Sequence, residues 1–324
     1  FTVGEKQTET NNIRVCQPLM LPFLNLPGIR AFNKKSVVHH VRKELKTLQM
    51  NSPIMVVTAP NACDYINHFN ESSVVYYCVD DFSEWPGLDK KLVKAMENKL
   101  LNESDILVAT SQNLYENIER QGKKVNLLTH GVDIKSFSTP QSNEHILLND
   151  IPKPRVGYFG LFDNRSNKKL LMDIARLLPE ISFVITGGIE TDVSQLQKIK
   201  NIYLTGSIPY VELAKMAKGF DICMLPYKIN KLTDSIQPLK FKEYLATGKP
   251  IISTPIKEAI KLKDYLDIAE TETQWAESIQ KNLIGLSPST REKRALFIKN
   301  QSWETKSEQF LQFIFDADTV SQSK

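Results

Sequence analysis

Short apolar runs alternate with amphipathic stretches along most of this 324-residue chain, and this alternation constrains the fold more than any other feature. Runs rich in β-branched and aromatic residues are typical of strands. We expect strands at residues 54–58, 74–79, 106–110, 125–129, 155–160, 181–186, 202–205, 222–225 and 251–254. Helix-like stretches lie between them, at 90–101, 111–120, 168–178 and 210–218. This alternation predicts βαβ units, and therefore an α/β fold with parallel sheets.

Two of the expected strands, VVYYCV (74–79) and FVIT (183–186), are apolar on both faces. Such strands are typical of a sheet that helices cover on both sides. After residue 268 the pattern is helical only, with helices expected near 272–284, 291–300 and 303–315.

The length of the chain favours two domains of ordinary size. A polar, proline-bearing segment at 138–154 marks the boundary between them. We therefore assign 1–150 to an N-terminal domain, 151–295 to a second domain and 296–324 to a C-terminal helix that returns toward the first. The first domain is short for a parallel α/β unit and opens on the polar FTVGEKQTETNN. We expect that it lacks one or two βα units that precede this sequence.

Composition narrows the class of protein. Hydrophobic residues make up 41% and charged residues 24%, which is typical of a globular protein. The net charge of +4 is too small to argue for a nucleic-acid partner. No 18-residue apolar run and no signal peptide is visible in the sequence, so we expect a cytoplasmic protein. The four cysteines lie far apart and are expected to be structural thiols.

The clearest chemical signal lies at 221–254, which reads as strand, loop, short helix and strand. Pro238 opens the helix where a missing N–H costs little, and Gly248 closes it. Lys240 and Glu243 are three residues apart and share one face of the helix. A helix N-terminus beside a lysine favours a phosphate, and a carboxylate one turn further on can accept hydrogen bonds from paired sugar hydroxyls. The segment predicts a nucleotide-diphosphate ligand.

Two glycines are expected at the same edge of the second sheet. Gly160 ends one strand, Gly187 follows another, and glycine there lets the backbone approach a ligand closely. In the first domain, Asp80 and Asp81 follow a buried strand, at the end where α/β proteins place chemistry. Either aspartate could instead cap the loop that follows. The pair could also suggest Mg²⁺, but the sequence shows no third ligand.

The motif PLKFKEYLATGKPIIST (238–254) resembles the donor-binding core of GT-B glycosyltransferases of the family 4 type, particularly the teichuronic-acid-type enzymes of bacteria. ILVATSQNLYENI (106–118), HGVDIKSF (130–137) and VGYFGLFDNR (156–165) resemble other parts of that family, in the same order. The resemblance covers roughly residues 74–255. It implies two Rossmann-like domains whose parallel sheets face each other across a cleft, with C-terminal helices that cross back to the first.

The resemblance also implies roles for single residues. Glu243 would hold the ribose hydroxyls, and Lys240, with the helix start at Pro238 and Leu239, would meet the diphosphate and stabilise the leaving group. The other implied donor-site positions are Gly160, Gly187, Arg165 as a diphosphate ligand, Tyr210 in the base-recognition loop and Tyr227 in the pocket wall. Arg165 could instead be an ordinary surface arginine, and Tyr210 could pack on the core. Asp80, with Asp81 as second choice, would act as the general base on the acceptor.

One position departs from the family. Many of its members carry a second glutamate eight residues before the ribose-binding one, where this chain has Ser235. Asp234 could substitute, or it could be an ordinary turn or cap residue. The identity of the donor sugar and the stereochemical course are therefore left open.

The implied function is transfer of a sugar from a nucleotide-diphosphate donor, with UDP or GDP, to a glycan or lipid-linked acceptor in bacterial surface polysaccharide synthesis. No metal or cofactor is expected, because the lysine and the helix dipole meet the phosphate charge. Two alternatives remain: a GT-B nucleotide-sugar epimerase, and a non-catalytic partner subunit that binds a nucleotide sugar.

A basic segment at 22–46 has two interpretations. Phe23, Leu24, Leu26 and Phe32 accompany most of its cations. The segment could contact the anionic inner face of the membrane, where a lipid-linked acceptor would lie. It could equally form a helix with an ordinary solvated face.

Overall fold

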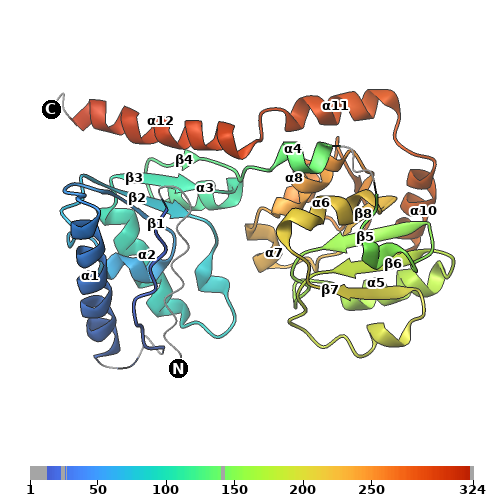
Figure 1. The fold of residues 1–324 in the computed structure, drawn as a ribbon, viewed down its shortest axis with the longest axis horizontal. Coiled ribbons are helices and arrows are strands. Elements are labelled where there is room, and N and C mark those ends of the chain that lie inside the picture. Colours follow the sequence, from blue (N-terminus) through green and yellow to red (C-terminus); the bar gives the residue numbers. More distant parts are fainter. Residues whose placement is uncertain (1–12, 23–25, 27, 140–142, 322–324) are drawn as a thin grey trace. The chain divides into compact units, whose positions relative to one another are not determined.

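The computed structural model describes residues 13–22, 26, 28–139 and 143–321 (Figure 1). The chain divides into two compact units, one of Phe1–Leu127 with Phe313–Lys324 and one of Leu128–Gln312. Each unit contains one parallel sheet. The polar opening 1–12, together with Phe23 and Leu24 of the basic segment, lies outside the described residues.

The first unit has a four-stranded sheet in the order β1-β2-β3-β4. Its strands are β1 (Ile54–Val57), β2 (Ser73–Cys78), β3 (Ile106–Ala109) and β4 (Asn126–Leu127). β2 lies in the middle of the core, with Tyr76 fully buried. β1 is an edge strand, and it leaves Ile54 and Val56 exposed.

Capping side chains begin the helices of this unit. Asp89 accepts hydrogen bonds from the first N–H groups of α2, and Ser111 does the same for α3. The helices are α1 (Ile29–Thr47), α2 (Lys90–Glu103) and α3 (Gln112–Glu119), with the 3₁₀ turns η1 (Pro60–Asp64) and η2 (Phe82–Glu84).

The second unit has a six-stranded sheet in the order β10-β9-β8-β5-β6-β7. Its strands are β5 (Arg155–Phe159), β6 (Ser182–Thr186), β7 (Ile202–Gly206), β8 (Ile222–Leu225), β9 (Ile251–Ser253) and β10 (Asp267–Ile268). Its helices begin with α4 (Ile134–Ser138), α5 (Lys168–Leu177), α6 (Tyr210–Lys218), α7 (Lys231–Ser235) and α8 (Leu239–Thr247). They continue with α9 (Lys257–Lys261), α10 (Glu272–Leu283) and α11 (Pro288–Ile298), and the turns are η3 (Ile146–Leu148) and η4 (Leu196–Lys198). The last helix, α12 (Trp303–Ser321), begins in the second unit, and its residues from Phe313 onward belong to the first.

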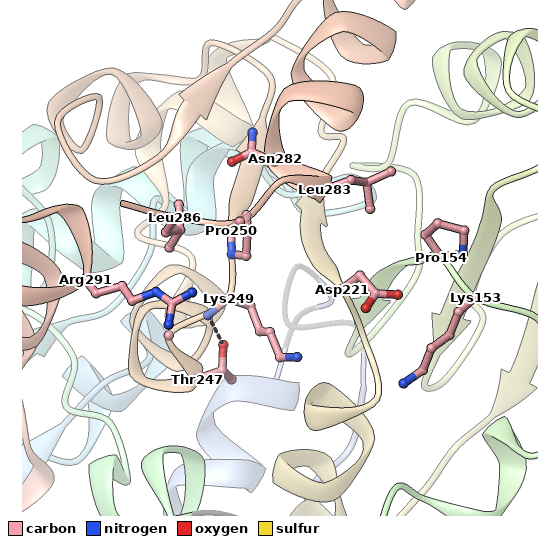
Figure 2. A pocket seen from close by; sticks show the side chains of 12 residues that line it. Lys153, Pro154, Asp221, Thr247, Lys249, Pro250, Asn282, Leu283, Leu286 and Arg291 are labelled. Atoms are coloured by element: carbon pink, nitrogen blue, oxygen red, sulfur yellow. Dashed lines mark hydrogen bonds between the residues drawn. The ribbon is translucent and has the colours of Figure 1, made fainter. Parts of the chain in front are cut away.

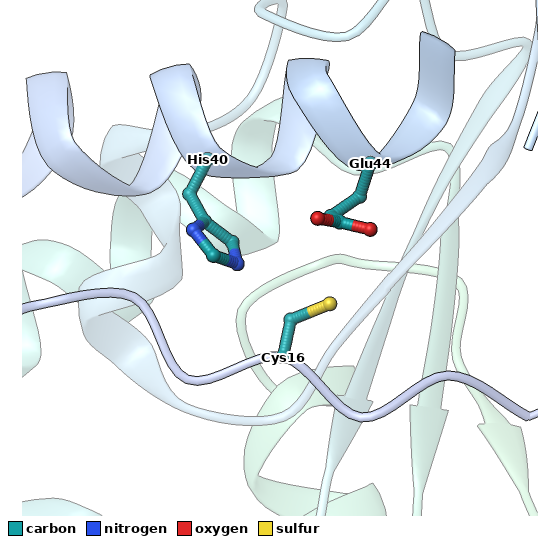
Figure 3. A group of neighbouring side chains, drawn as sticks. All are labelled: Cys16, His40 and Glu44. Atoms are coloured by element: carbon teal, nitrogen blue, oxygen red, sulfur yellow. The ribbon is translucent and has the colours of Figure 1, made fainter. Parts of the chain in front are cut away.

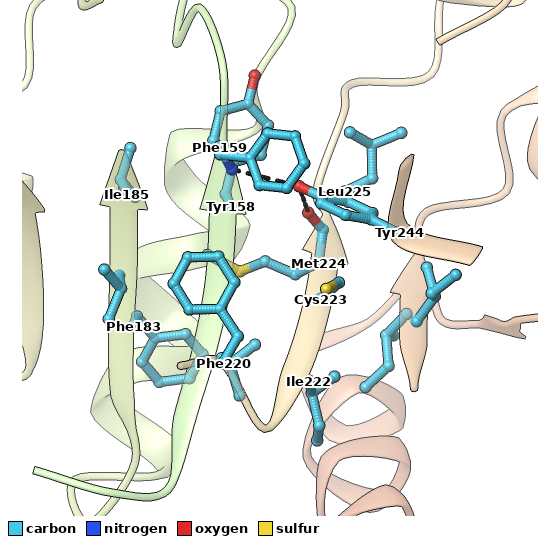
Figure 4. Packing of buried hydrophobic residues seen from close by; sticks show 14 of the residues in the cluster. Tyr158, Phe159, Phe183, Ile185, Phe220, Ile222, Cys223, Met224, Leu225 and Tyr244 are labelled. Atoms are coloured by element: carbon cyan, nitrogen blue, oxygen red, sulfur yellow. Dashed lines mark hydrogen bonds between the residues drawn. The ribbon is translucent and has the colours of Figure 1, made fainter. Parts of the chain in front are cut away.

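Every strand predicted from the sequence is present, most with ends within a residue or two of the prediction, whereas the two-residue β10 was missed. The core of the second unit is aromatic around β5, β6 and β8 (Figure 4). A methyl group on Gly157 would lie 2.2 Å from the Phe220 ring, so this glycine makes room for a core side chain.

The division between the units lies at Leu127/Leu128, earlier than the boundary at 150/151 expected from the sequence. Residues of the intervening segment pack into the second unit, where Phe137 and Leu148 are buried in the core. The Arg155 side chain donates hydrogen bonds to the carbonyls of Leu148 and Ile151 and so fastens the segment. Polar composition concealed this packing, since only a few apolar side chains carry it.

No helix in the described ranges is long and apolar enough to span a membrane.

Candidate functional site

The loops that follow β5 and β6 form a close-packed pair of glycines. Gly160 has φ +109° and Gly187 has φ +134°, values that L-residues with side chains rarely adopt. A methyl group on Gly187 would lie 2.2 Å from the Gly160 carbonyl oxygen, and one on Gly160 would lie 2.6 Å from Lys240 Cε. Both positions therefore require glycine, and the gap above Gly160 is filled by the Lys240 side chain.

Lys240 lies among aromatic rings and is not within salt-bridge distance of a carboxylate. Its Nζ is 5.2 Å from the centroid of the Tyr158 ring and 3.4 Å from the Tyr227 hydroxyl. Within the described residues it forms no ion pair. The ammonium charge of Lys240 is consequently available to an anion.

Arg165 approaches the same cluster, with Cζ 5.7 Å from the Tyr227 ring centroid. Its charge is already balanced, because Nε donates to both carboxylate oxygens of Asp163, at 3.0 and 2.9 Å, and a terminal nitrogen lies 2.8 Å from Oδ2. Lys240, not Arg165, therefore supplies the positive charge of the site that no salt bridge neutralises.

The start of α8 adds to this charge. Pro238 is the N-cap residue, one position before the first helical residue Leu239, and no side chain caps the helix. The partial positive charge of the helix dipole is thus not neutralised by a capping carboxylate. Gly248 ends the helix in the left-handed conformation, as the sequence predicted.

Glu243 lies one turn beyond Lys240 and is only 4% exposed. The Tyr210 hydroxyl donates a hydrogen bond of 3.2 Å to Glu243 Oε1. Burial raises the pKa of Glu243, while Lys240 and the Tyr210 hydrogen bond act to lower it. The Glu243 carboxylate thus accepts a hydrogen bond from one neutral group, the Tyr210 hydroxyl, which a ligand hydroxyl could replace.

Tyr210 is the last member of a row of aromatic rings. The Tyr210 ring meets Phe137 edge-on at 6.3 Å, Phe137 stacks on Phe159 at 5.8 Å, and Phe159 meets Tyr244 at 4.9 Å. The row fixes the position of the phenol, although the tyrosine itself is half exposed. Core packing and contact with Glu243 are therefore both features of Tyr210.

The structure thus brings Gly160, Gly187, Arg165, Tyr227 and Lys240 together. Glu243 lies on the next turn of α8, and Tyr210 reaches it from the start of α6. Asp234, by contrast, accepts the backbone N–H of Lys257 at 3.3 Å, which places its carboxylate at the start of α9. The side chain of Ser235 lies outside the described set.

Asp80 and Asp81 belong to the first unit. Asp80 accepts hydrogen bonds from the Asp81 N–H at 2.8 Å and from Trp85 Nε1 at 3.1 Å. Asp81 caps η2 and accepts bonds from the N–H and the hydroxyl of Ser83, at 3.1 and 2.6 Å. Both carboxylates thus stabilise the loop, in line with the capping interpretation, and a role as general base stays a prediction.

Asp81 also lines a cavity of about 290 Å³ in the first unit, together with Lys94 and Glu97. Burial raises the pKa of Glu97, whose carboxylate accepts a 3.0 Å hydrogen bond from the Tyr76 hydroxyl. Glu97 was not predicted from the sequence, because nothing in the sequence distinguishes a buried glutamate in the middle of a helix from a solvated one.

Lys242 was missed as well. It is buried, and its Nζ donates to Thr129 Oγ1 at 2.9 Å, to Gln301 Oε1 at 2.8 Å and to the His130 carbonyl. The His130 N–H in turn donates to Gln237 Oε1 at 3.0 Å. These bonds fasten α8 to the HGVD segment. The sequence did contain one signal for this role. Lys242 is two residues from Lys240, so the two side chains lie on different faces of the helix.

A group of possible metal ligands lies in the first unit (Figure 3). Donor atoms of Cys16, His40 and Glu44 lie within 4.8 Å of one another, and His40 and Glu44 share one face of α1. Arg14 Nε lies 2.6 Å from Glu44 Oε2, so this carboxylate already has a cationic partner.

The geometry of the second unit agrees with a family match. Residues 153–283, which contain Gly160, Lys240 and Glu243, match the family described as glycosyl transferases group 1. The second unit carries a group 1 glycosyltransferase domain. The match does not extend to the first unit.

A curated relative extends the likeness. The chain is 25% identical over 183 residues to a protein of Bacillus subtilis (strain 168) that is provisionally named the teichuronic acid biosynthesis glycosyltransferase TuaH. The alignment covers 54% of this chain and 46% of the relative, so the chain spans about half the length of the curated relative it matches.

Solved structures show the fold. Sucrose-phosphate synthase from Thermosynechococcus elongatus has a TM-score of 0.76 at 17% identity, over 96% of this chain and 85% of that one. HepE from Anabaena in complex with UDP has a TM-score of 0.66 at 12% identity, over 88% and 84%. The first unit and the glycosyltransferase domain each contain one parallel sheet, and together they form a GT-B fold, as predicted.

Proposed function

We propose that this chain is part of a glycosyltransferase that moves a sugar from a nucleotide-diphosphate donor to a glycan or lipid-linked acceptor. One observation carries the proposal: Lys240, free of any ion pair in the described ranges, lies at the uncapped start of α8 and fills the space above Gly160. A cation and a helix N-terminus at the carboxyl edge of a parallel sheet form a site for phosphate groups.

In this proposal the diphosphate lies at the start of α8, beside Lys240. As the bond to the sugar breaks, negative charge grows on the departing diphosphate, and Lys240 stabilises that charge. Arg165, already paired with Asp163, orients the cluster more than it adds charge. No metal ion is needed in this scheme, because the lysine and the helix dipole meet the charge.

Glu243 would bind the ribose. A carboxylate can accept two hydrogen bonds from neighbouring hydroxyls, and the ligand would replace the single bond from Tyr210. UDP is a suitable first candidate for the nucleotide, because HepE was solved in complex with UDP. The name of TuaH supports a product in a bacterial surface polysaccharide.

The acceptor side of the reaction is proposed for the first unit, where Asp80 or Asp81 would take the proton of the acceptor hydroxyl. We also propose that α1 contacts an anionic membrane surface at the cytoplasmic face, because it combines several cations with a half-exposed Phe32. Co-sedimentation with anionic and neutral vesicles tests this contact, and equal binding to both would contradict it.

A thermal-shift screen with nucleoside diphosphates and their sugars tests the donor site. A ligand that binds the native state raises the melting temperature, so we expect UDP or GDP to do so and their nucleosides to do so less. No shift with any nucleotide would overturn the proposal. With the selected donor sugar, release of nucleotide that depends on an added acceptor distinguishes a transferase from an epimerase, which converts the donor alone.

A further inference from the structure

A second cavity lies at the opposite edge of the second unit's sheet (Figure 2). Its volume is about 510 Å³. Pro154 precedes β5, Asp221 precedes β8 and Pro250 precedes β9, so the cavity lies where these strands begin. Lys240 and Gly160 lie where β5 ends, and the two sites are therefore separate.

The lining of this cavity is rich in cations. Lys153, Lys249 and Arg291 contribute to it, against the single carboxylate of Asp221. Figure 2 shows the ammonium groups of Lys153 and Lys249 directed toward the middle of the cavity. Among the residues that the structure describes, the side chains of Lys249 and Arg291 have no ion-pair partner.

The acids nearby are already engaged. Asp221 Oδ2 accepts the backbone N–H of Arg155 at 2.8 Å. Glu144 is shared by Lys153 and Arg155, each at 2.5 Å. The ends of α8 and α10 add roughly half a negative charge each, and this leaves an excess of about one positive charge in the cavity wall.

Cations behind the wall increase the excess. Arg294 donates to the Lys249 carbonyl at 2.7 Å, and its Nε is buried without a partner. Burial lowers the pKa of Arg294 to about 10. Burial and the charge of Lys249 lower the pKa of Lys218. Among the described residues neither Arg294 nor Lys218 forms a salt bridge, and the charge of Asp267 only partly offsets the effect of burial on the pKa of Arg294.

We propose that this cavity is a binding site for a small polyanion that carries phosphate groups. Its volume is in the range of pockets that hold small organic ligands, which is more than inorganic phosphate needs. Thr247, Gly248 and Lys249 at its wall end the helix that begins beside Lys240. The ligand would therefore contact one end of α8 while the donor contacts the other.

Isothermal titration of the full chain with pyrophosphate and with a sugar bisphosphate, at constant ionic strength, tests the site. Pyrophosphate could also enter the site at Lys240, so the titration is repeated with Lys240→Ala. We expect the Lys240→Ala protein to retain one polyanion site. In the Lys249→Ala/Arg291→Ala protein we expect the affinity of that site to fall at least tenfold.

Lys169→Ala is the matched control, because Lys169 is an exposed lysine of the same unit that lies outside the cavity. It should bind as the parent does. No binding to the Lys240→Ala protein, or binding that the Lys249→Ala/Arg291→Ala change leaves unaltered, would overturn the proposal. A thermal melt checks that each variant folds. The proposed donor site can fail independently, since that failure would appear as unchanged nucleotide binding in Lys240→Ala.

Discussion

At the scale of single residues, the donor site depends on which charges are already neutralised. Arg165 and Lys240 both lie near Tyr227, but only Arg165 has a carboxylate partner, Asp163. The family resemblance implied a diphosphate role for both cations without showing this difference. Ion pairs between residues two apart, such as Asp163 and Arg165, depend on loop geometry that periodicity does not reveal.

Tyr210→Phe tests the hydrogen bond to Glu243. The phenol stabilises the ionised carboxylate, so its removal raises the pKa of Glu243. Nucleotide binding requires the ionised carboxylate. As the pH is lowered, the Tyr210→Phe protein should therefore lose nucleotide binding at a higher pH than the parent does. At neutral pH the change in affinity should stay within about tenfold, as one hydrogen bond is worth about 1 kcal/mol. Dissociation constants from pH 5 to 8 measure this, and superimposable profiles for the two proteins would contradict it.

At the scale of elements, two faces of α8 have different roles. Lys240 and Glu243 serve the proposed donor, whereas the buried Lys242 fastens the helix to Thr129 and Gln301. Burial lowers the pKa of Lys242 to about 7, well below its value in an unfolded chain. Between these two values the unfolded chain binds more protons, so this residue makes the free energy of unfolding rise with pH.

Lys242→Met tests this attachment. Methionine retains much of the apolar stem but leaves the oxygens of Thr129 and Gln301 without their donor, so we expect a loss of about 1–3 kcal/mol in unfolding free energy. The rise in stability between pH 7 and 10 should also become smaller. Urea denaturation at both pH values measures the two effects. Equal stability of the two proteins at both would show that Lys242 does not hold α8.

Much of the element pattern could be predicted, since strands such as β6 (SFVIT) and β8 (ICML) are runs of mainly apolar residues that are buried along their length. The two-residue β10 could not, because so short a strand leaves no periodicity. Lys242 and Glu97 were missed for a different reason. Their burial comes from packing between elements, and a polar residue on a helix carries no local sign of it.

At the scale of the whole molecule, the two units carry different groups of polar side chains. The glycosyltransferase domain combines glycine turns, an uncapped helix and a free lysine, whereas Asp81 and Glu97 of the first unit line a smaller cavity. Residues 128–150 belong to the second unit because Phe137 and Leu148 complete its core. We therefore propose that residues after this boundary bind the donor and that the first unit binds the acceptor.

The most direct test of the central claim is whether Lys240 binds phosphate. Calorimetry would give dissociation constants for the nucleoside diphosphate selected by the screen and for its nucleoside, with the parent, Lys240→Ala and Lys169→Ala. We predict that Lys240→Ala weakens binding of the diphosphate at least about tenfold, as loss of a charged hydrogen bond of about 1.5–3 kcal/mol implies, and leaves nucleoside binding unchanged. Equal affinity of the parent and Lys240→Ala for the diphosphate would contradict it.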